Sequence, residues 1–171
     1  LQMGGIPQIL AGIEKGAIAA GVLSPPINIK AKKMGMKELL DIGTLKIPYQ
    51  QTTIITRQEW IKKNPGTMRA LTRAIVEAIH KIKTDKPFAQ KILAKYTNIE
   101  DPEVIEEAYR IFALKYLPEV PYPSLPAVRR RLAEFASTDE KARAANANDF
   151  VDLRWVQELE SSGFIAKLYR R

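Results

Sequence analysis

The sequence of 171 residues has no cysteine and a single histidine, His80. Without cysteine the chain forms no disulfide, offers no thiolate nucleophile and builds no cysteine-ligated metal site. One imidazole also excludes a cluster of histidine ligands. His80 lies beside Arg73 and Glu77 on the polar side of a predicted helix, so we expect it to face solvent rather than to act in catalysis. The sequence therefore holds few of the groups that usually carry catalysis.

Long apolar runs are also lacking. No stretch approaches the roughly 20 consecutive apolar residues of a membrane-spanning helix. The first residues, Leu1-Gln2-Met3, do not show the basic and then apolar pattern of a signal peptide. Because the chain enters an apolar segment at once, we expect that something upstream was removed. No internal repeat of fixed period is visible.

What remains is the composition of an ordinary globular protein, with 46% hydrophobic and 27% charged residues. That is enough apolar material for the core of one domain or of two small lobes. The formal net charge of +8 favours anionic partners or surfaces. The densest basic run, Arg129-Arg130-Arg131, has neither interleaved aromatic residues nor a nucleic-acid-binding motif. We expect the basic residues to cover solvated helix faces and expect no nucleic-acid partner.

The first fifty-odd residues have the pattern of alternating helix and strand. Apolar positions at helical spacing predict a helix from Ile6 to Lys15, which Gly16 ends. Residues 17–23 form a continuous apolar run typical of a strand covered on both faces. Ser24-Pro25-Pro26 ends this strand, because proline cannot donate to a ladder. A short helix follows over 27–33, and the β-branched residues 51–56 predict a further strand.

After residue 56 the pattern is helical. Asn64-Pro65 and Asp101-Pro102 each place a capping residue before a proline at the first helical position. Prolines make the segment 117–123 extended and stiff, and Ala142–Asn148 has little to pack and is expected to be loose. The predicted helices cover 57–63, segments that begin near 65, 85 and 101, one around 125–135, and one over 152–162. The fold class predicted from these patterns is α/β, with a few strands at the N-terminal end followed by a mainly helical C-terminal portion.

Motifs in a particular order along the chain resemble those of a known family of binding proteins. They are Gly5-Ile6-Pro7, the run from Leu10 to Gly16, the run from Ala20 to Pro26, the run from Gly35 to Asp41, Ile47-Pro48-Tyr49, the run from Arg57 to Ile61, Asn64-Pro65, and the run from Asn148 to Asp152. In this order they resemble the C-terminal half of an NMT1/THI5-like substrate-binding protein, a group related to the alkanesulfonate, taurine and nitrate receptors of ABC importers. One departure is Ala19, where the family commonly has an acidic residue.

The resemblance implies a partial type II periplasmic-binding-protein fold. Residues 1–50 would belong to the second α/β lobe and contain the ligand loop, and residues 51–171 would form a crossover strand and a helical region that packs on the first lobe. That N-terminal lobe is not in this sequence, so binding would need it or a partner chain.

The implied protein is not an enzyme and has no cofactor. It would be the solute-binding component of an ABC importer, would take a small organic or anionic nutrient between two lobes, and would deliver it to the permease in the membrane. Its compartment would be periplasmic or otherwise extracytoplasmic.

The candidate ligand loop is Ser24-Pro25-Pro26, with Asn28 in the short helix that follows. Ligands of open α/β sheets bind beyond the carboxyl ends of the strands, where a serine hydroxyl and free N–H groups contact an anion or polar group. Two prolines fix the shape of such a loop, so that little entropy is lost on binding. The alternative is that Ser-Pro-Pro is only a strand terminator.

Three further residues are candidates for ligand contact. Tyr49 and Gln50 follow the second-lobe segment, where an aromatic ring and an amide suit a planar or polar ligand, although an ordinary turn before a strand would look the same. Gly5 in the Gly4-Gly5 pair would let the backbone approach a ligand closely.

Alternative functions stay open at this point. A THI5-like protein of pyrimidine-precursor biosynthesis depends on histidine and on a cysteine-rich stretch, which this chain lacks. The effector-binding domain of a transcription regulator shares the fold class but needs an upstream helix-turn-helix, and no residues here resemble one. A helical interaction module would show an exposed apolar groove and no cleft at Ser24.

Overall fold

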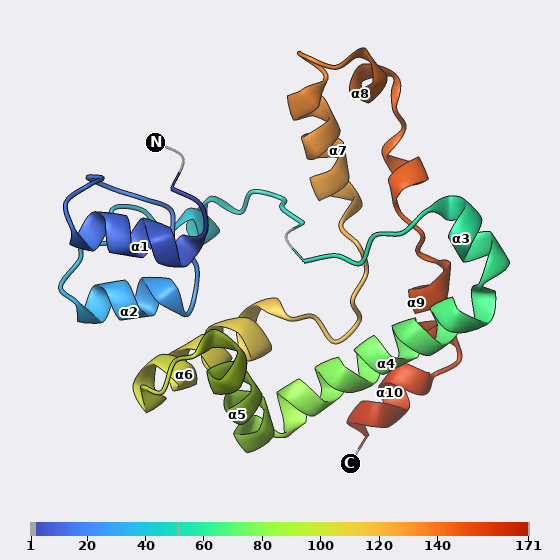
Figure 1. The fold of residues 1–171 in the computed structure, drawn as a ribbon. Helices are drawn as coiled ribbons and strands as arrows, with labels where there is room; N and C mark the ends of the chain where they lie inside the picture. Colours follow the sequence, from blue (N-terminus) through green and yellow to red (C-terminus); the bar gives the residue numbers. More distant parts are fainter. Residues whose placement is uncertain (1–2, 51, 171) are drawn as a thin grey trace. The chain divides into compact units, whose positions relative to one another are not determined.

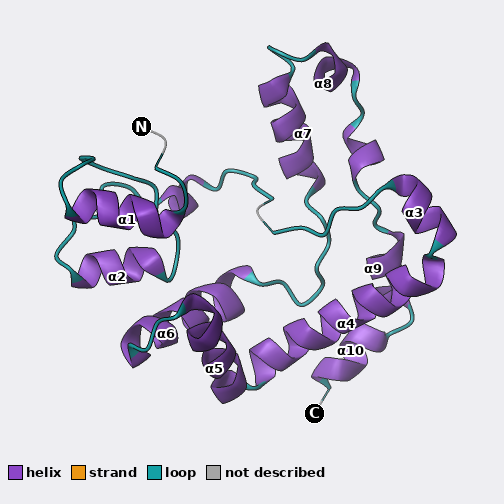
Figure 2. Ribbon diagram, viewed as in Figure 1, coloured by secondary structure: helices purple, strands orange, loops and turns teal. Residues whose placement is uncertain are grey.

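The computed structural model describes residues 3–50 and 52–170. Within these ranges every regular element is a helix (Figures 1 and 2). The elements are α1 (Ile6–Glu14), α2 (Ile27–Lys33), η1 (Ile42–Leu45), α3 (Gln58–Lys63), α4 (Pro65–Thr84), α5 (Lys86–Thr97), α6 (Pro102–Tyr109), η2 (Arg110–Tyr116), α7 (Leu125–Phe135), α8 (Glu140–Ala144), η3 (Ala147–Phe150), α9 (Arg154–Ser161) and α10 (Phe164–Tyr169). Of the short elements, η1 and η3 are 3-10 helices and η2 is a π-helix. The prediction of a mainly helical C-terminal portion is confirmed.

The prediction of strands at 17–23 and 51–56 is corrected, because the described residues form no strand. Residues 17–23 connect α1 to α2 without a ladder partner, and Val22 is 68% exposed. Residues 52–56 are likewise irregular, whereas Gln51 lies outside the described residues. A strand is stabilised by hydrogen bonds to a neighbouring strand, and an apolar run by itself does not supply that neighbour. The described residues are therefore mainly helical, and the strands expected at the N-terminal end are not formed among them.

Side-chain caps explain where several helices begin. The Asp85 carboxylate accepts from Phe88 N–H at the start of α5, and the Ser124 hydroxyl accepts from Ala127 N–H at the start of α7. Asp101 accepts from two backbone N–H groups of α6, as its predicted cap requires. Asn64 differs from the expectation, because its amide donates to the Trp60 carbonyl at the end of α3.

The chain divides into two compact units. Unit 1 comprises Leu1–Asp41 and Lys81–Leu117, and unit 2 comprises Ile42–His80 and Pro118–Arg171. Each unit is therefore built from two separate stretches of sequence. The division predicted at residues 50 and 51 concerned the lobes of a longer protein, and it stays a prediction.

The core of unit 1 lies around α5 and α6. Ile99, Val104 and Ile105 form one buried cluster, against which Ile27 and Ile29 of α2 pack. A second cluster is made by Ala89, Tyr109 and Ala113, with Ile82 against it. Because α2 contributes to the first cluster, the loop that precedes it is held next to the best-packed part of this unit.

The core of unit 2 is built on one face of α4. Met68, Thr72, Val76 and Ile79 are buried there at helical spacing, and the Thr72 hydroxyl donates to the Met68 carbonyl. On the same helix Leu71 and Ile75 are only half-buried. Further buried residues come from four other elements: Ala127, Ala147, Trp155, Val156 and Ile165. Among the described helices, none is long and apolar enough to cross a membrane.

Candidate functional site

The predicted ligand loop lies directly before α2 in unit 1. The Ser24 carbonyl accepts from Asn28 N–H at 3.2 Å, and the Pro26 carbonyl accepts from Lys30 N–H at 3.2 Å, so the loop runs straight into the helix. Pro26 is buried, and Ser24 and Pro25 are half-buried. The peptide bond between Pro25 and Pro26 is cis. Ser24, Pro25, Pro26 and Asn28 thus form one continuous segment, and ligand binding by it stays a prediction.

Asn28 carries an unsatisfied polar atom in this loop. Its side-chain oxygen, Oδ1, is buried and accepts no hydrogen bond from any described residue. Leaving a buried acceptor without a donor costs about 1–3 kcal/mol, so a structure usually keeps such an atom for a reason. The atom is able to accept a hydrogen bond from an N–H or O–H group of a ligand or of another part of the protein.

Tyr49 and Gln50 belong to unit 2, and the structure does not bring them to the Ser24 loop within one unit. Tyr49 is 71% exposed. Gln50 is already engaged, because its Oε1 accepts from Ser124 N–H at 2.7 Å and its Nε2 donates to the Thr52 carbonyl at 3.2 Å. Gln50 therefore anchors the start of α7, a role that sequence reasoning missed.

Gly5 lies at the start of α1 in unit 1, where its carbonyl accepts from Ile9 N–H. Its φ of −82° is open to any residue, whereas the neighbouring Gly4 has a φ of +84° that favours glycine. A Cβ on Gly5 would come close to the flexible end of Gln8 and would lie at ordinary contact distance from Pro7. In the Gly4-Gly5 pair, Gly4 is therefore the position whose backbone conformation favours glycine. Ligand contact by Gly5 stays a prediction.

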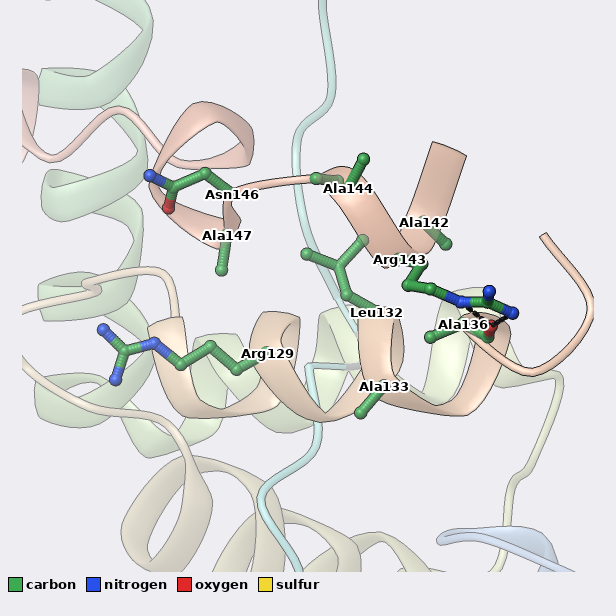
Figure 3. Close-up of a pocket in the computed structure, with 10 residues that line it drawn as sticks. Arg129, Leu132, Ala133, Ala136, Ala142, Arg143, Ala144, Asn146 and Ala147 are labelled. Atoms are coloured by element: carbon green, nitrogen blue, oxygen red, sulfur yellow. Dashed lines mark hydrogen bonds between the residues drawn. The ribbon is translucent and has the colours of Figure 1, made fainter. Parts of the chain in front are cut away.

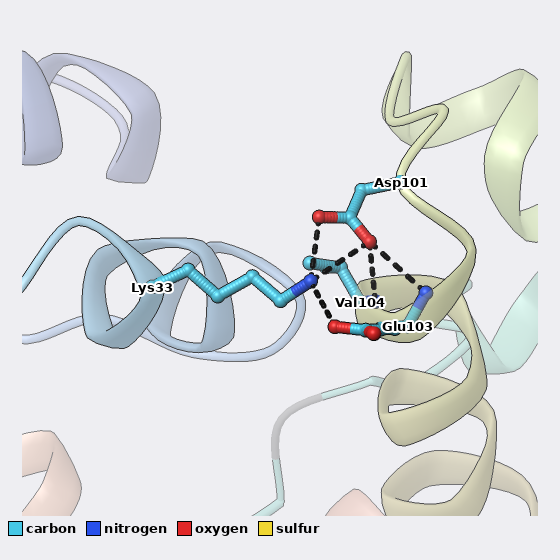
Figure 4. Close-up of polar contacts among 4 residues, drawn as sticks. All are labelled: Lys33, Asp101, Glu103 and Val104. Carbon is cyan, nitrogen blue, oxygen red and sulfur yellow. Dashed lines mark hydrogen bonds and ion pairs between the residues drawn. The ribbon is translucent and has the colours of Figure 1, made fainter.

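A cluster of charges holds α2 against the start of α6 (Figure 4). Lys33 Nζ lies 2.7 Å from Asp101 Oδ2 and 2.6 Å from Glu103 Oε2. The hydrogen bond from Lys33 lowers the pKa of Asp101, and the bonds to Asp101 and Glu103 raise the pKa of Lys33. No group of three or more metal-ligating side chains is formed by the described residues. We therefore assign this cluster a structural role.

Two hollows in unit 2 contain none of the predicted site residues. One, of about 460 Å³, lies between α7 and residues 142–147 (Figure 3). The other, of about 380 Å³, lies between α4 and α9 and is lined by Arg69, Ala70, Arg73, Trp155, Glu158 and Leu159. Neither hollow was predicted from the sequence, and the segment Ala142–Asn148 beside the first was expected to be loose.

The hollow between α4 and α9 is closed off by its own charges. Arg69 Nε lies 2.8 and 3.0 Å from the two carboxylate oxygens of Glu158. The guanidinium groups of Arg69 and Arg154 both lie over the Trp155 ring, at 5.5 and 5.4 Å from its centroid. Such paired and stacked arginines stabilise the helix contact. Trp155 is thus a core residue of unit 2.

Comparison with known proteins does not identify the chain. No protein family matches the sequence, and no curated protein or solved structure is significantly similar to it.

Proposed function

We propose that the chain is part of the solute-binding protein of an ABC importer, with a type II periplasmic-binding fold. In this proposal it binds a small organic or anionic nutrient without changing it chemically. The order of motifs from Gly5-Ile6-Pro7 to the run Asn148–Asp152 supports the proposal. Residues 1–50 then belong to the second lobe, and residues 51–171 return the chain toward the first.

The observation that carries the proposal is the buried, unsatisfied Oδ1 of Asn28, whose backbone N–H donates to the Ser24 carbonyl. In a binding protein, a ligand N–H or O–H group takes the place of the missing donor, and a small number of placed polar groups is what fixes a ligand in such a cleft. Pro25 and Pro26 keep the loop in shape before the ligand arrives.

The segment 17–23 also fits this proposal. This segment connects α1 with α2 and has no regular secondary structure. Its apolar residue Val22 is exposed. In a complete lobe, neighbouring strands from the rest of the protein would pair with this segment and cover Val22. The Ser24 loop would then stand at the carboxyl end of a strand, where α/β proteins bind ligands.

Tyr49 stays a proposed ligand contact. Its exposed ring is free to stack on a planar part of the ligand. We assign Gln50 a positioning role instead, because its Oε1 and Nε2 are both hydrogen-bonded to backbone groups of unit 2. The proposed partner is a membrane permease, and the proposed location is outside the cytoplasm.

The test uses the gene product as its native cell makes it, after its intact mass has been measured. Ligands are sought by thermal shift with a panel of small sulfonates, carboxylates and nitrate. We expect Asn28→Ala and Tyr49→Ala each to weaken binding of the active compound about ten-fold, as expected from losing a hydrogen bond or an aromatic contact. Tyr96→Ala, at an equally exposed tyrosine of unit 1, is the matched control. Unchanged affinity in the first two variants would reject the assigned site.

A second candidate function is a helical interaction module. Exposed large apolar residues are concentrated between residues 34 and 55, and they include Leu39, Leu40, Tyr49, Ile54 and Ile55. Exposed apolar surface of this kind marks binding sites for other proteins. The same panel decides between the two: no small molecule stabilises a protein-binding module, whereas Ser24→Ala lowers the affinity of a solute-binding protein.

A further inference from the structure

The groove between α7 and residues 142–147 has the features of a small binding site. We call it the α7 groove (Figure 3). Its lining comprises Arg129, Leu132, Ala133, Ala136 and the six residues from Ala142 to Ala147. Alanines dominate, and their side chains are too short to fill the space of about 460 Å³. Leu132 projects from α7 toward the opposite segment. The alanine methyl groups and Leu132 are the apolar part of this otherwise polar, open lining, and they suit a hydrocarbon chain.

Arg129 and Arg143 lie at the two ends of the α7 groove, and only the Arg143 guanidinium is hydrogen-bonded within the described residues. Arg143 donates from Nε and Nη2 to the Ala136 carbonyl, at 3.1 and 3.0 Å. The guanidinium group of Arg129 makes no hydrogen bond or ion pair with any residue that the structure describes. Its neighbours Arg130 and Arg131 are both paired with Glu134, at 3.0 and 2.6 Å. Arg129 is thus the arginine of this run whose donors are available to a ligand.

The charge of the lining is one-sided. Two guanidinium groups line the α7 groove, and none of the ten lining residues is acidic. A guanidinium pairs best with a carboxylate, which it contacts through two parallel N–H groups. The groove therefore matches a ligand with one carboxylate and an apolar body.

We propose that the α7 groove binds a medium-chain carboxylate. The carboxylate lies on Arg129, and the acyl chain follows Leu132 and the alanines toward Ala136. Along α7 the distance from Arg129 to Ala136 is about 10 Å, from a rise of 1.5 Å per residue. An extended acyl chain of about eight carbons has a comparable length. This site is separate from the Ser24 loop and does not rest on the proposed solute-binding function.

The experiment is an NMR titration of the 171-residue chain with sodium octanoate, kept below the concentrations at which it forms micelles. We expect saturable shifts in the amides of 129–136 and 142–147. Octylamine, with the same chain and the opposite charge, produces none of them. Arg129→Gln weakens octanoate binding about 10-fold to 100-fold, the effect of losing a charge-assisted hydrogen bond. Arg131→Gln removes one positive charge from the same helix and leaves binding unchanged.

Ala144→Asp is the second variant, because it places a carboxylate on the wall opposite α7 while leaving Arg129 in place. We expect it to abolish octanoate binding, and its circular dichroism shows that the fold is kept. The proposal is overturned if octanoate does not saturate the wild type, if octylamine binds equally well, or if Arg129→Gln and Arg131→Gln behave alike. Asn28→Ala leaves octanoate binding unchanged, so failure of one proposal is distinguishable from failure of the other.

Discussion

Asp101 combines a helix cap with an ion pair between two helices. Its carboxylate accepts from Glu103 N–H and Val104 N–H at the start of α6, and it receives Lys33 from α2. Each of these contacts favours the ionised carboxylate over the protonated one. The side chain therefore links the local start of one helix to the packing of unit 1, and it does so only while it is charged.

This charge requirement predicts the effect of acid on stability. The pKa of Asp101 is lower in the folded protein, chiefly because Lys33 hydrogen-bonds to it. Its contribution to the free energy of unfolding is therefore complete above the unfolded value of about 3.9 and is lost as pH falls through the lower folded pKa. We expect Asp101→Asn to reduce the melting temperature at pH 7, and we expect its difference from the wild type to shrink as pH falls.

Asp149→Asn is the control for this prediction, because it removes the same charge from an exposed side chain of unit 2. It should change the melting temperature little at either pH. Melting curves from pH 2 to 7 are the measurement. An equal loss at both ends of this range in Asp101→Asn would show that the carboxylate does not stabilise through its charge.

Single residues also show how far the site could be predicted. The Ser24 loop is a local feature set by adjacent prolines and a helix start, and its role in ligand binding stays a prediction. The engagement of Gln50 could not be predicted, since its partner Ser124 is distant in sequence. The unsatisfied Oδ1 of Asn28 and the free guanidinium of Arg129 depend on what surrounds them in space, which no local pattern reveals.

At the scale of elements, helices were predictable and strands were not. A helix satisfies its hydrogen bonds within one segment, so capping residues such as Asp85 and Asp101 and the apolar period mark it locally. A strand needs a partner elsewhere in the chain or outside it. The run 17–23 has strand composition, but within the described residues it has no such partner. The short α8 and η3 were missed because their alanines give no amphipathic period.

The packing of α6 leads to a prediction at this scale. Ile105 is 6% exposed and lies in the cluster that joins α6 to α2 and α5. We expect Ile105→Ala to lower the free energy of unfolding by about 2–4 kcal/mol and Ile105→Val by about 1 kcal/mol. Ile55→Ala removes the same atoms from a side chain that is 87% exposed, so it should change stability by less than about 0.5 kcal/mol.

Urea unfolding followed by circular dichroism measures all three variants. Similar losses from Ile105→Ala and Ile55→Ala would mean that α6 does not pack as described. Hydrogen exchange of Ile105→Ala adds a second readout. If only the α2 amides lose protection, Ile105 stabilises the contact between α6 and α2 alone.

At the scale of the whole molecule, both units leave large apolar side chains uncovered. Leu39 is 83% exposed, and Ile55 is exposed to a similar degree. Uncovered apolar surface drives association, and the net charge of +8 opposes it by repulsion. We expect the chain to self-associate increasingly as salt screens its charge.

The double variant Leu39→Ser/Ile55→Ser tests this expectation. It should reduce self-association in sedimentation velocity at high salt and leave the melting temperature of the dilute protein nearly unchanged, because neither side chain is buried. Lys37→Ser/Thr53→Ser changes exposed polar residues nearby and serves as the control. Undiminished association of the double variant would place the contact surface elsewhere.

The positions of the two tryptophans have a consequence for spectroscopy. Trp60 and Trp155 both belong to unit 2, and unit 1 has none. Trp155 is buried against two guanidinium groups, and its indole N–H donates to Asp152 at 3.0 Å, whereas Trp60 is exposed. Intrinsic tryptophan emission therefore reports the melting of unit 2 and is blind to unit 1. A single tryptophan introduced at Tyr109 would give unit 1 a fluorophore of its own, so that the two halves of the folding reaction become separately visible.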